Sequence, residues 1–210
     1  MSVSRDGWFR NKRWNDKVAA DFEAKLKRTK RKGQPLRIQA CTLAESQPEV
    51  ALELLTRYFQ QPDERIFDGQ AHVDRATALL ALTRIEDAVS AYEDALKYER
   101  VVPGIVTQAY IELPYVVSVH QLTEHYEKAR KVLKRHRERL TFPVEHFMWH
   151  ASAALLADAD GDRVEAKENA RQALEFASKD KSGFKRHQTI GLVTEKHSEA
   201  LQKLRAFCDS

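Results

Sequence analysis

Apolar residues recur at steps of three and four along most of this chain, which is the spacing of one face of an α-helix. The segment after Asp162 shows the pattern clearly, because Val164, Ala166, Ala170 and Ala173 belong to one narrow stripe. Most members of the stripe are small. The pattern therefore predicts an amphipathic helix that can approach a neighbouring helix closely.

The same pattern returns along the chain at a nearly fixed distance. Four alanines stand at equivalent places, with spacings of 37, 41 and 37 residues: Ala51, Ala88, Ala129 and Ala166. Another apolar helical segment precedes each alanine, at 36–44, 73–82, 105–119 and 147–157. The repeating unit is therefore predicted to be a helix, a turn and a second helix. Such a unit cannot bury its apolar face alone, so neighbouring units must stack.

Residues 158–162, "DADGD", have the alternating acids of a calcium loop and also the composition of a tight turn. A calcium-binding EF-hand loop needs glycine at its sixth position and glutamate at its twelfth. Here the glycine, Gly161, is fourth, and Asn169 occupies the twelfth place. We therefore predict a turn in which Gly161 takes a positive φ and Asp160 or Asp162 caps the next helix.

The second and fourth units resemble the tetratricopeptide-repeat (TPR) family. The residues that carry this resemblance are Ala76, Ala88, Tyr92 and Ala95, and then Ala154, Gly161, Asp162, Ala166 and Ala173. The spacing exceeds the family's usual repeat of about 34 residues, and Pro114 falls inside the first helix of the third unit. The resemblance implies an all-α fold, a right-handed α-solenoid of about four helix-turn-helix pairs with flanking capping helices.

The resulting domain organisation has four parts. Residues 1–14 form an N-terminal arm, and residues 15–32 form a capping helix that starts at Asn15 or Asp16. Residues 33–179 form the TPR-like array. Residues 180–210 supply a loop and a C-terminal capping helix, expected over 194–208, that buries its apolar residues. Those residues are Leu201, Leu204 and Phe207.

Composition agrees with a soluble helical protein, since 42% of the 210 residues are hydrophobic and 31% are charged. Seven glycines and six prolines are too few for the many tight turns of an all-β fold. We expect no membrane association, because no apolar run approaches the length of a bilayer span. Cys41 and Cys208 lie far apart in the sequence and are typical of reduced thiols, which favours a cytoplasmic location.

Few residues are candidates for metal binding or catalysis. His146 and His150 are four residues apart, so a helix would place both on one face, as in some zinc sites. The glutamate of a zinc-protease motif is missing and no third ligand is evident, so we interpret both residues as packed imidazoles. No nucleophile elbow, phosphate-binding loop or dinucleotide motif is present. We therefore predict no catalytic residue, no metal and no cofactor, and expect that the protein is not an enzyme.

The resemblance implies a protein-protein interaction scaffold or adaptor that binds a protein or peptide partner in a concave groove. Carried over residue by residue, the groove comprises Arg37, Gln70, Val73, Thr77, Ile111, Ser118, Gln121, Met148, Leu155 and Asp158. Some members of the family clamp a C-terminal carboxylate with Lys, Asn and Arg. Val73 and Thr77 stand where Lys and Asn would be needed, so that clamp is not expected. The sequence does not indicate an oligomeric state.

Two basic runs, 25–32 and 128–139, suggest an alternative. In this alternative the chain is a nucleic-acid-associated or regulatory helical-repeat protein that uses these two runs for binding. The candidate residues are Lys27, Arg28, Lys30, Lys128, Lys131, Lys134, Arg135 and Arg139. This alternative is not favoured, because no aromatic residues interleave with the runs to stack on bases. The aromatic residues of the arm, Trp8, Phe9 and Trp14, are expected to pack on the first helix pair instead.

Overall fold

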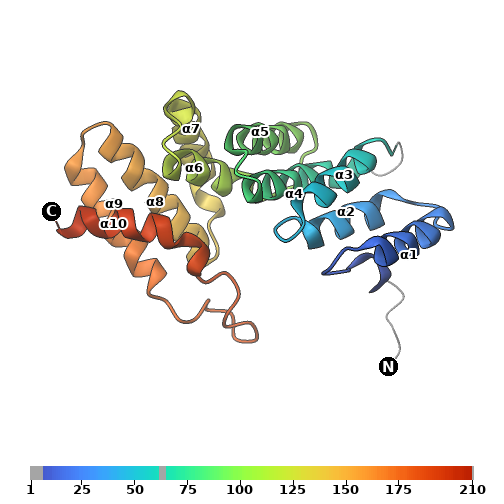
Figure 1. Cartoon of the computed structure of the whole chain (residues 1–210). Helices are drawn as coiled ribbons and strands as arrows, with labels where there is room; N and C mark the ends of the chain where they lie inside the picture. The colour runs from blue at the N-terminus through green and yellow to red at the C-terminus, as the bar shows by residue number, and fades with distance from the viewer. Residues whose placement is uncertain (1–6, 62–64, 210) are drawn as a thin grey trace. The chain divides into compact units, whose positions relative to one another are not determined.

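The computed structural model describes residues 7–61 and 65–209. The structure is 73% helix and contains no strand among these residues, which confirms the predicted all-α class (Figure 1). The α-helices are α1 (Asp16–Lys27), α2 (Gly33–Leu43), α3 (Pro48–Phe59), α4 (Asp68–Ala81), α5 (Ile85–Val101), α6 (Ala109–Val119), α7 (Tyr126–His136), α8 (Pro143–Ala159), α9 (Arg163–Ala177) and α10 (Ser198–Asp209). Short 3-10 helices are η1 (Gly7–Phe9), η2 (Arg65–Phe67), η3 (Thr123–His125), η4 (Arg137–Arg139) and η5 (Glu195–His197).

The chain divides into two compact units, residues 1–109 and 110–210. In the first, α2 packs on α3, α4 packs on α5, and both α2 and α3 contact α4. In the second, α8 packs on α9 and α7, and α10 covers both α8 and α9. Among the helices of the described residues, none combines the length and the apolar character needed to cross a membrane.

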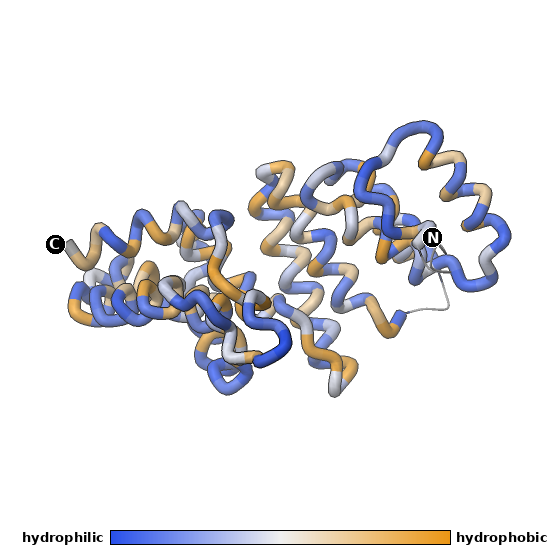
Figure 2. Tube along the Cα trace, turned by 90° about the horizontal axis from the view of Figure 1, so that it is seen from below, coloured by the Kyte–Doolittle hydropathy of each residue, from blue (hydrophilic) through white to orange (hydrophobic). Residues whose placement is uncertain are grey.

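The predicted helix pairs appear in order along the chain as α2–α3, α4–α5, α6–α7 and α8–α9. Their alternating apolar and polar residues are visible around each helix in Figure 2. The four anchoring alanines, one on the second helix of each pair, are all buried. Burial of such small side chains is what allows two helix backbones to approach closely.

Two helix starts differ from the predicted ones. α6 begins at Ala109 and not at residue 105, because Gly104 turns the chain at a φ of +93°. Glu99 fixes the chain just before α6. Its carboxylate accepts one hydrogen bond from the backbone N–H of Thr107 (2.8 Å) and another from the Thr107 hydroxyl (2.7 Å). α10 begins at Ser198, and η5 occupies most of the four residues before it.

Three of the turns within the helix pairs have the same geometry. The second residue after the first helix takes a left-handed φ: +57° at Thr83, +56° at Gln121 and +79° at Gly161. The next residue donates its backbone N–H back to a carbonyl five residues earlier, as Asp162 does to Ala157 (2.9 Å). Equivalent bonds join Arg84 to Leu79 (2.9 Å) and Leu122 to Val117 (3.0 Å). This is the Schellman motif, which satisfies the last carbonyls of a helix.

The turn predicted at residues 158–162 is therefore confirmed. Gly161 supplies the positive φ, and the side chain of Asp162 accepts a hydrogen bond from the backbone N–H of Glu165 (2.9 Å). Asp162 thus caps α9. The other two turns use Thr83 and Gln121, residue types that give no such signal in a sequence.

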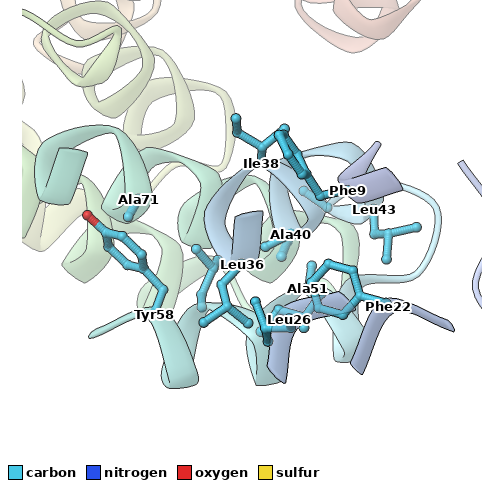
Figure 3. Close-up of a cluster of buried hydrophobic side chains, with 14 residues drawn as sticks. Phe9, Phe22, Leu26, Leu36, Ile38, Ala40, Leu43, Ala51, Tyr58 and Ala71 are labelled. Atoms are coloured by element: carbon cyan, nitrogen blue, oxygen red, sulfur yellow. The ribbon is translucent and has the colours of Figure 1, made fainter. Parts of the chain in front are cut away.

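The core of the first unit includes the N-terminal arm, as Figure 3 shows for Phe9, Phe22, Leu26 and Leu36. Trp8 and Trp14 both pack their rings on Phe22, at centroid distances of 5.3 and 5.2 Å. The arm thus packs on α1, and η1 also contacts α2, the first helix of the pair on which the packing was predicted.

Polar contacts also fix the arm. The buried side chain of Gln39 accepts a hydrogen bond from the backbone N–H of Asn11 (2.9 Å) and donates one to its carbonyl (2.8 Å). Gln47 binds the backbone of Trp14 in the same two-way manner, at 2.6 and 3.0 Å. Asn15 then caps α1 as predicted, because its side chain accepts from the N–H of Val18 (3.0 Å).

Candidate functional site

The predicted groove residues fall in both units, and four of them are inaccessible to a partner because they are buried. Val73, Ile111, Ser118 and Met148 are buried. The first helix of a pair is covered on several sides: α4 contacts α2, α3 and α5, while α8 contacts α7, α9 and α10. Positions such as Val73 on α4 and Met148 on α8 therefore belong to the core. This corrects the predicted groove at these four residues.

The remaining predicted residues keep some exposure. Arg37, Gln70, Thr77 and Leu155 are half-buried, and Gln121 and Asp158 are exposed. Gln121 is the left-handed residue of the α6–α7 turn, so its position is set by the backbone of that turn. Binding of a partner at these six residues stays a prediction.

In the first unit, Arg37 is already engaged within the fold. Its guanidinium forms an ion pair with Asp74 (3.0 Å), and Gln70 donates to the other carboxylate oxygen of Asp74 (3.1 Å). Asp74 is only 4% exposed, and this burial raises the pKa of its carboxyl group. The Arg37 cation balances a buried carboxylate of its own chain, so it is not available to clamp the carboxylate of a partner.

A thiol adjoins the same cluster. The residue Cys41 is exposed as a whole, but its thiol is hydrogen-bonded to Asp74. Burial of the sulfur, together with the neighbouring carboxylate, raises the pKa of Cys41 to about 11. The thiol therefore stays protonated at neutral pH, which makes it a poor nucleophile.

The second unit contains a cavity of about 640 Å³ between α9 and the end of α10. Its lining residues are Asp158, Arg163, Val164, Ala166, Lys167, Glu168, Arg171 and Phe207. Asp158 is thus a predicted groove residue that lies at a cavity. The others come mainly from the first half of α9, which is the second helix of its pair.

Two apolar residues of this cavity correct the sequence prediction. Val164 was assigned to the inward stripe of its helix, yet it is 82% exposed. Phe207 was expected to be buried, but it and Leu201 are only half-buried, whereas Leu204 and Ala200 fill the contact of α10 with its neighbours. The apolar lining of the cavity consists of residues that the helical pattern had placed in the core.

The cavity also has a distinct charge arrangement. Arg163, Lys167 and Arg171 are four residues apart, so they form one ridge along α9. None of these three cations pairs with a carboxylate in the described part of the chain. The acids at the rim are Asp158 and Glu168, and Glu168 accepts a hydrogen bond from Gln172 (3.2 Å).

His146 and His150 pack as the sequence suggested. Their rings stack on Phe176 at centroid distances of 4.5 and 5.8 Å, and the ring of His150 also contacts the side-chain oxygen of Asn169 (3.0 Å). Burial lowers the pKa of both imidazoles, so both are neutral at pH 7. They hold α8 against α9.

All eight candidate residues of the two basic runs are exposed. The structure adds aromatic neighbours that the sequence of the second run lacks. Arg137 lies over the ring of Trp149 at 5.0 Å, and Arg139 lies over that of Tyr110 at 5.6 Å. Because these rings come from α8 and α6, residues distant in sequence, no local pattern could have revealed them.

Comparison with protein-family models, with curated proteins and with solved structures finds no match for this chain.

Proposed function

We propose that this protein is a non-catalytic scaffold, in which TPR-like helix pairs stack as a right-handed solenoid and bind a segment of a partner protein. One observation carries the proposal. The cavity beside α9 combines exposed apolar surface with a ridge of cations, on a helix that is packed firmly against α8.

The partner segment that fits this cavity carries carboxylates and at least one large apolar residue. Like charges four residues apart on a helix destabilise it by about 0.2–0.5 kcal/mol per pair, and a bound carboxylate would remove that repulsion along Arg163, Lys167 and Arg171. An apolar side chain of the partner would cover Val164 and Phe207. Burial of apolar surface contributes about 25 cal/mol per Å².

A cytoplasmic location belongs to the same proposal. Both cysteines, Cys41 and Cys208, are free thiols in the structure, which suits a reducing compartment.

Selection of short random peptides on the immobilised protein tests the proposal. We expect the selected peptides to be rich in Asp and Glu around an apolar residue. Val164→Glu and Lys167→Glu should each weaken their binding by about tenfold or more, equivalent to about 1.4 kcal/mol. Isothermal titration calorimetry with the selected peptides gives the dissociation constants.

Val106→Glu is the matched control, because Val106 is an exposed valine (57%) of the first unit, remote from the cavity in sequence. It should leave peptide binding unchanged. Peptides that bind Val164→Glu and Lys167→Glu as tightly as the unmodified protein would refute this site, as would a selection that yields no binding peptide.

A further inference from the structure

The basic excess of this chain is concentrated at its beginning. Between residues 7 and 36 there are ten basic residues and three acidic ones, whereas the whole chain has 35 basic and 31 acidic residues. The ten are Arg10, Lys12, Arg13, Lys17, Lys25, Lys27, Arg28, Lys30, Arg31 and Lys32. The excess of seven is larger than the net charge of the entire chain, +4. The rest of the molecule is therefore slightly acidic.

All ten of these cations are exposed. None of them forms an ion pair with a carboxylate in the described part of the chain. One of the three nearby acids is also occupied elsewhere, since Glu23 binds Arg57 through both carboxylate oxygens, at 2.6 and 3.0 Å. The positive charge of this region is not balanced within the fold.

The fold brings two separate parts of this region together. The arm contributes Trp8 and Arg10, and the loop between α1 and α2 contributes Thr29 and Arg31, to one cavity of about 250 Å³. Its other lining residues are Phe9, Gln34, Pro35 and Ile38.

The arm side of this cavity is held in place. Gln39 binds the backbone of Asn11, the residue after Arg10. The ring of Trp8 packs against Phe9 and Phe22, at 5.2 and 5.3 Å, yet Trp8 remains only half-buried and lines the cavity. The cavity thus brings together two arginines and part of an indole, and the arm that carries Arg10 and Trp8 is held in place.

We infer that the N-terminal arm, α1 and the loop that follows it bind a single-stranded nucleic acid. The cavity takes one phosphate between Arg10 and Arg31, with a base against Trp8, and the surrounding lysines and arginines follow the backbone on either side. Single-strand binding sites combine a positive surface with an aromatic platform in this way. This surface lies in the first unit and is independent of the partner cavity beside α9.

Fluorescence anisotropy of a labelled oligothymidylate, measured with the full chain over a range of salt concentrations, tests the inference. Each phosphate neutralised on a single strand contributes about −0.7 to the slope of log K against log salt. If about five of the ten cations meet phosphates, affinity should fall about 100-fold between about 50 and about 200 mM salt.

The double variant Arg10→Ala, Arg31→Ala should bind about tenfold more weakly at the lower salt concentration, with a slope smaller by about 0.7, because the two arginines share one phosphate. The double variant Lys97→Ala, Arg100→Ala is the matched control. It removes two exposed cations of α5 and the same charge, and it should bind as the unmodified protein does. Thermal melting shows whether each variant is folded.

Three results would overturn the inference. The first is no binding at the lower salt concentration. The second is an equal loss in the two double variants, which would mean that net charge alone is responsible. The third is binding of poly-glutamate with the same affinity and slope, which would assign the surface to acidic proteins. Quenching of tryptophan fluorescence by the oligonucleotide, lost in the Arg10, Arg31 variant, would support the cavity as the contact point.

Discussion

The α4–α5 pair and the α8–α9 pair occupy equivalent places in the repeat, one in each unit, but their second helices are buried differently. α5 buries Val89 and Tyr92 beside its alanines. The buried residues of α9 are all alanines, and Val164 beside them is exposed. The small residues fix how closely the two helices of a pair approach. The larger residues decide how much of the second helix is buried. In α5 they are part of the core, whereas in α9 an apolar residue remains exposed.

Substitution of a buried alanine by phenylalanine should give the largest difference in stability between the two pairs. Ala88→Phe places a large ring in a closed contact, so we expect it to lower the free energy of unfolding by about 3 kcal/mol. Ala166 is also buried but borders the cavity beside α9, so we expect Ala166→Phe to cost less, about 1 kcal/mol. Urea denaturation of both variants measures the difference. Equal costs would mean that the two helices are equally closed.

Acid should weaken both pairs, through His72 on α4 and through His150 on α8. Burial lowers the pKa of both imidazoles, although Asp94 opposes the shift at His72 and Asn169 opposes it at His150. The unfolded chain therefore binds more protons than the folded one near the ordinary histidine pKa of about 6.5. The free energy of unfolding is fully retained above that pH and falls as the pH drops below it, toward the lowered pKa of the folded state.

Urea midpoints between pH 8 and pH 5 test this sign. His72→Gln and His150→Gln should each make the profile flatter, each through its own pair. If the midpoint rises as the pH falls through this range, the two imidazoles are charged in the folded protein and their packing is wrongly described.

Gly161→Val isolates the backbone cost of the turn in the α8–α9 pair. An added Cβ would meet no atom within 4 Å, so the cost comes from the left-handed φ alone. A β-branched residue there should lower the free energy of unfolding by about 1–2 kcal/mol. Thermal melting measures it. Gly161→Asn is the control, since asparagine tolerates this conformation and should melt close to the unmodified protein.

Thr83→Gly is the reverse experiment in the α4–α5 pair. Thr83 already holds a β-branched side chain at a φ of +57°, and it is exposed. Removal of the side chain should relieve about 1–2 kcal/mol of strain, against about 0.5–1 kcal/mol for the greater freedom of glycine in the unfolded chain. We expect a net stabilisation of about 0–1.5 kcal/mol. A melting temperature that falls would show that the Thr83 hydroxyl, which donates to the carbonyl of Leu82 (2.6 Å), matters more than the strain.

Calcium should not change the melting temperature of the protein. Because residues 158–162 form a helix-helix turn, the metal has no ligand set to favour the folded state. A saturated site at 100 times its dissociation constant would add about 2.7 kcal/mol. A rise in melting temperature with calcium that Asp158→Ala abolishes would contradict the turn interpretation.

The sequence predicted the order of the helices well, because the alanines of the second helices reappear at a regular distance and all four are buried. It also predicted the turn at Gly161, where the residue type itself indicates the conformation. It could not predict the equivalent turns at Thr83 and Gln121, since helix packing on both sides imposes a φ that these residues do not prefer.

The predicted groove was less accurate for a related reason. A repeat register places a residue on a face of its helix, but it does not show how many neighbours cover that face. Val73 and Met148 were therefore assigned to a surface although they are buried, and Val164 was assigned to the core although it is exposed. The basic cavity at Trp8, Arg10 and Arg31 needed the arm to fold back on α2, a contact made by glutamine side chains that no periodicity marks.

The glutamines that hold the arm have a consequence for its amide protons. A glutamine side chain offers the same donor and acceptor as a peptide group, so Gln39 and Gln47 bind Asn11 and Trp14 as an adjacent strand would. The N–H groups of Asn11 and Trp14 should therefore exchange with deuterium as slowly as those of α2, although neither residue lies in regular secondary structure. Gln39→Ala should release the first of these protons, and it would make the chain near Arg10 accessible to trypsin while the helices remain folded.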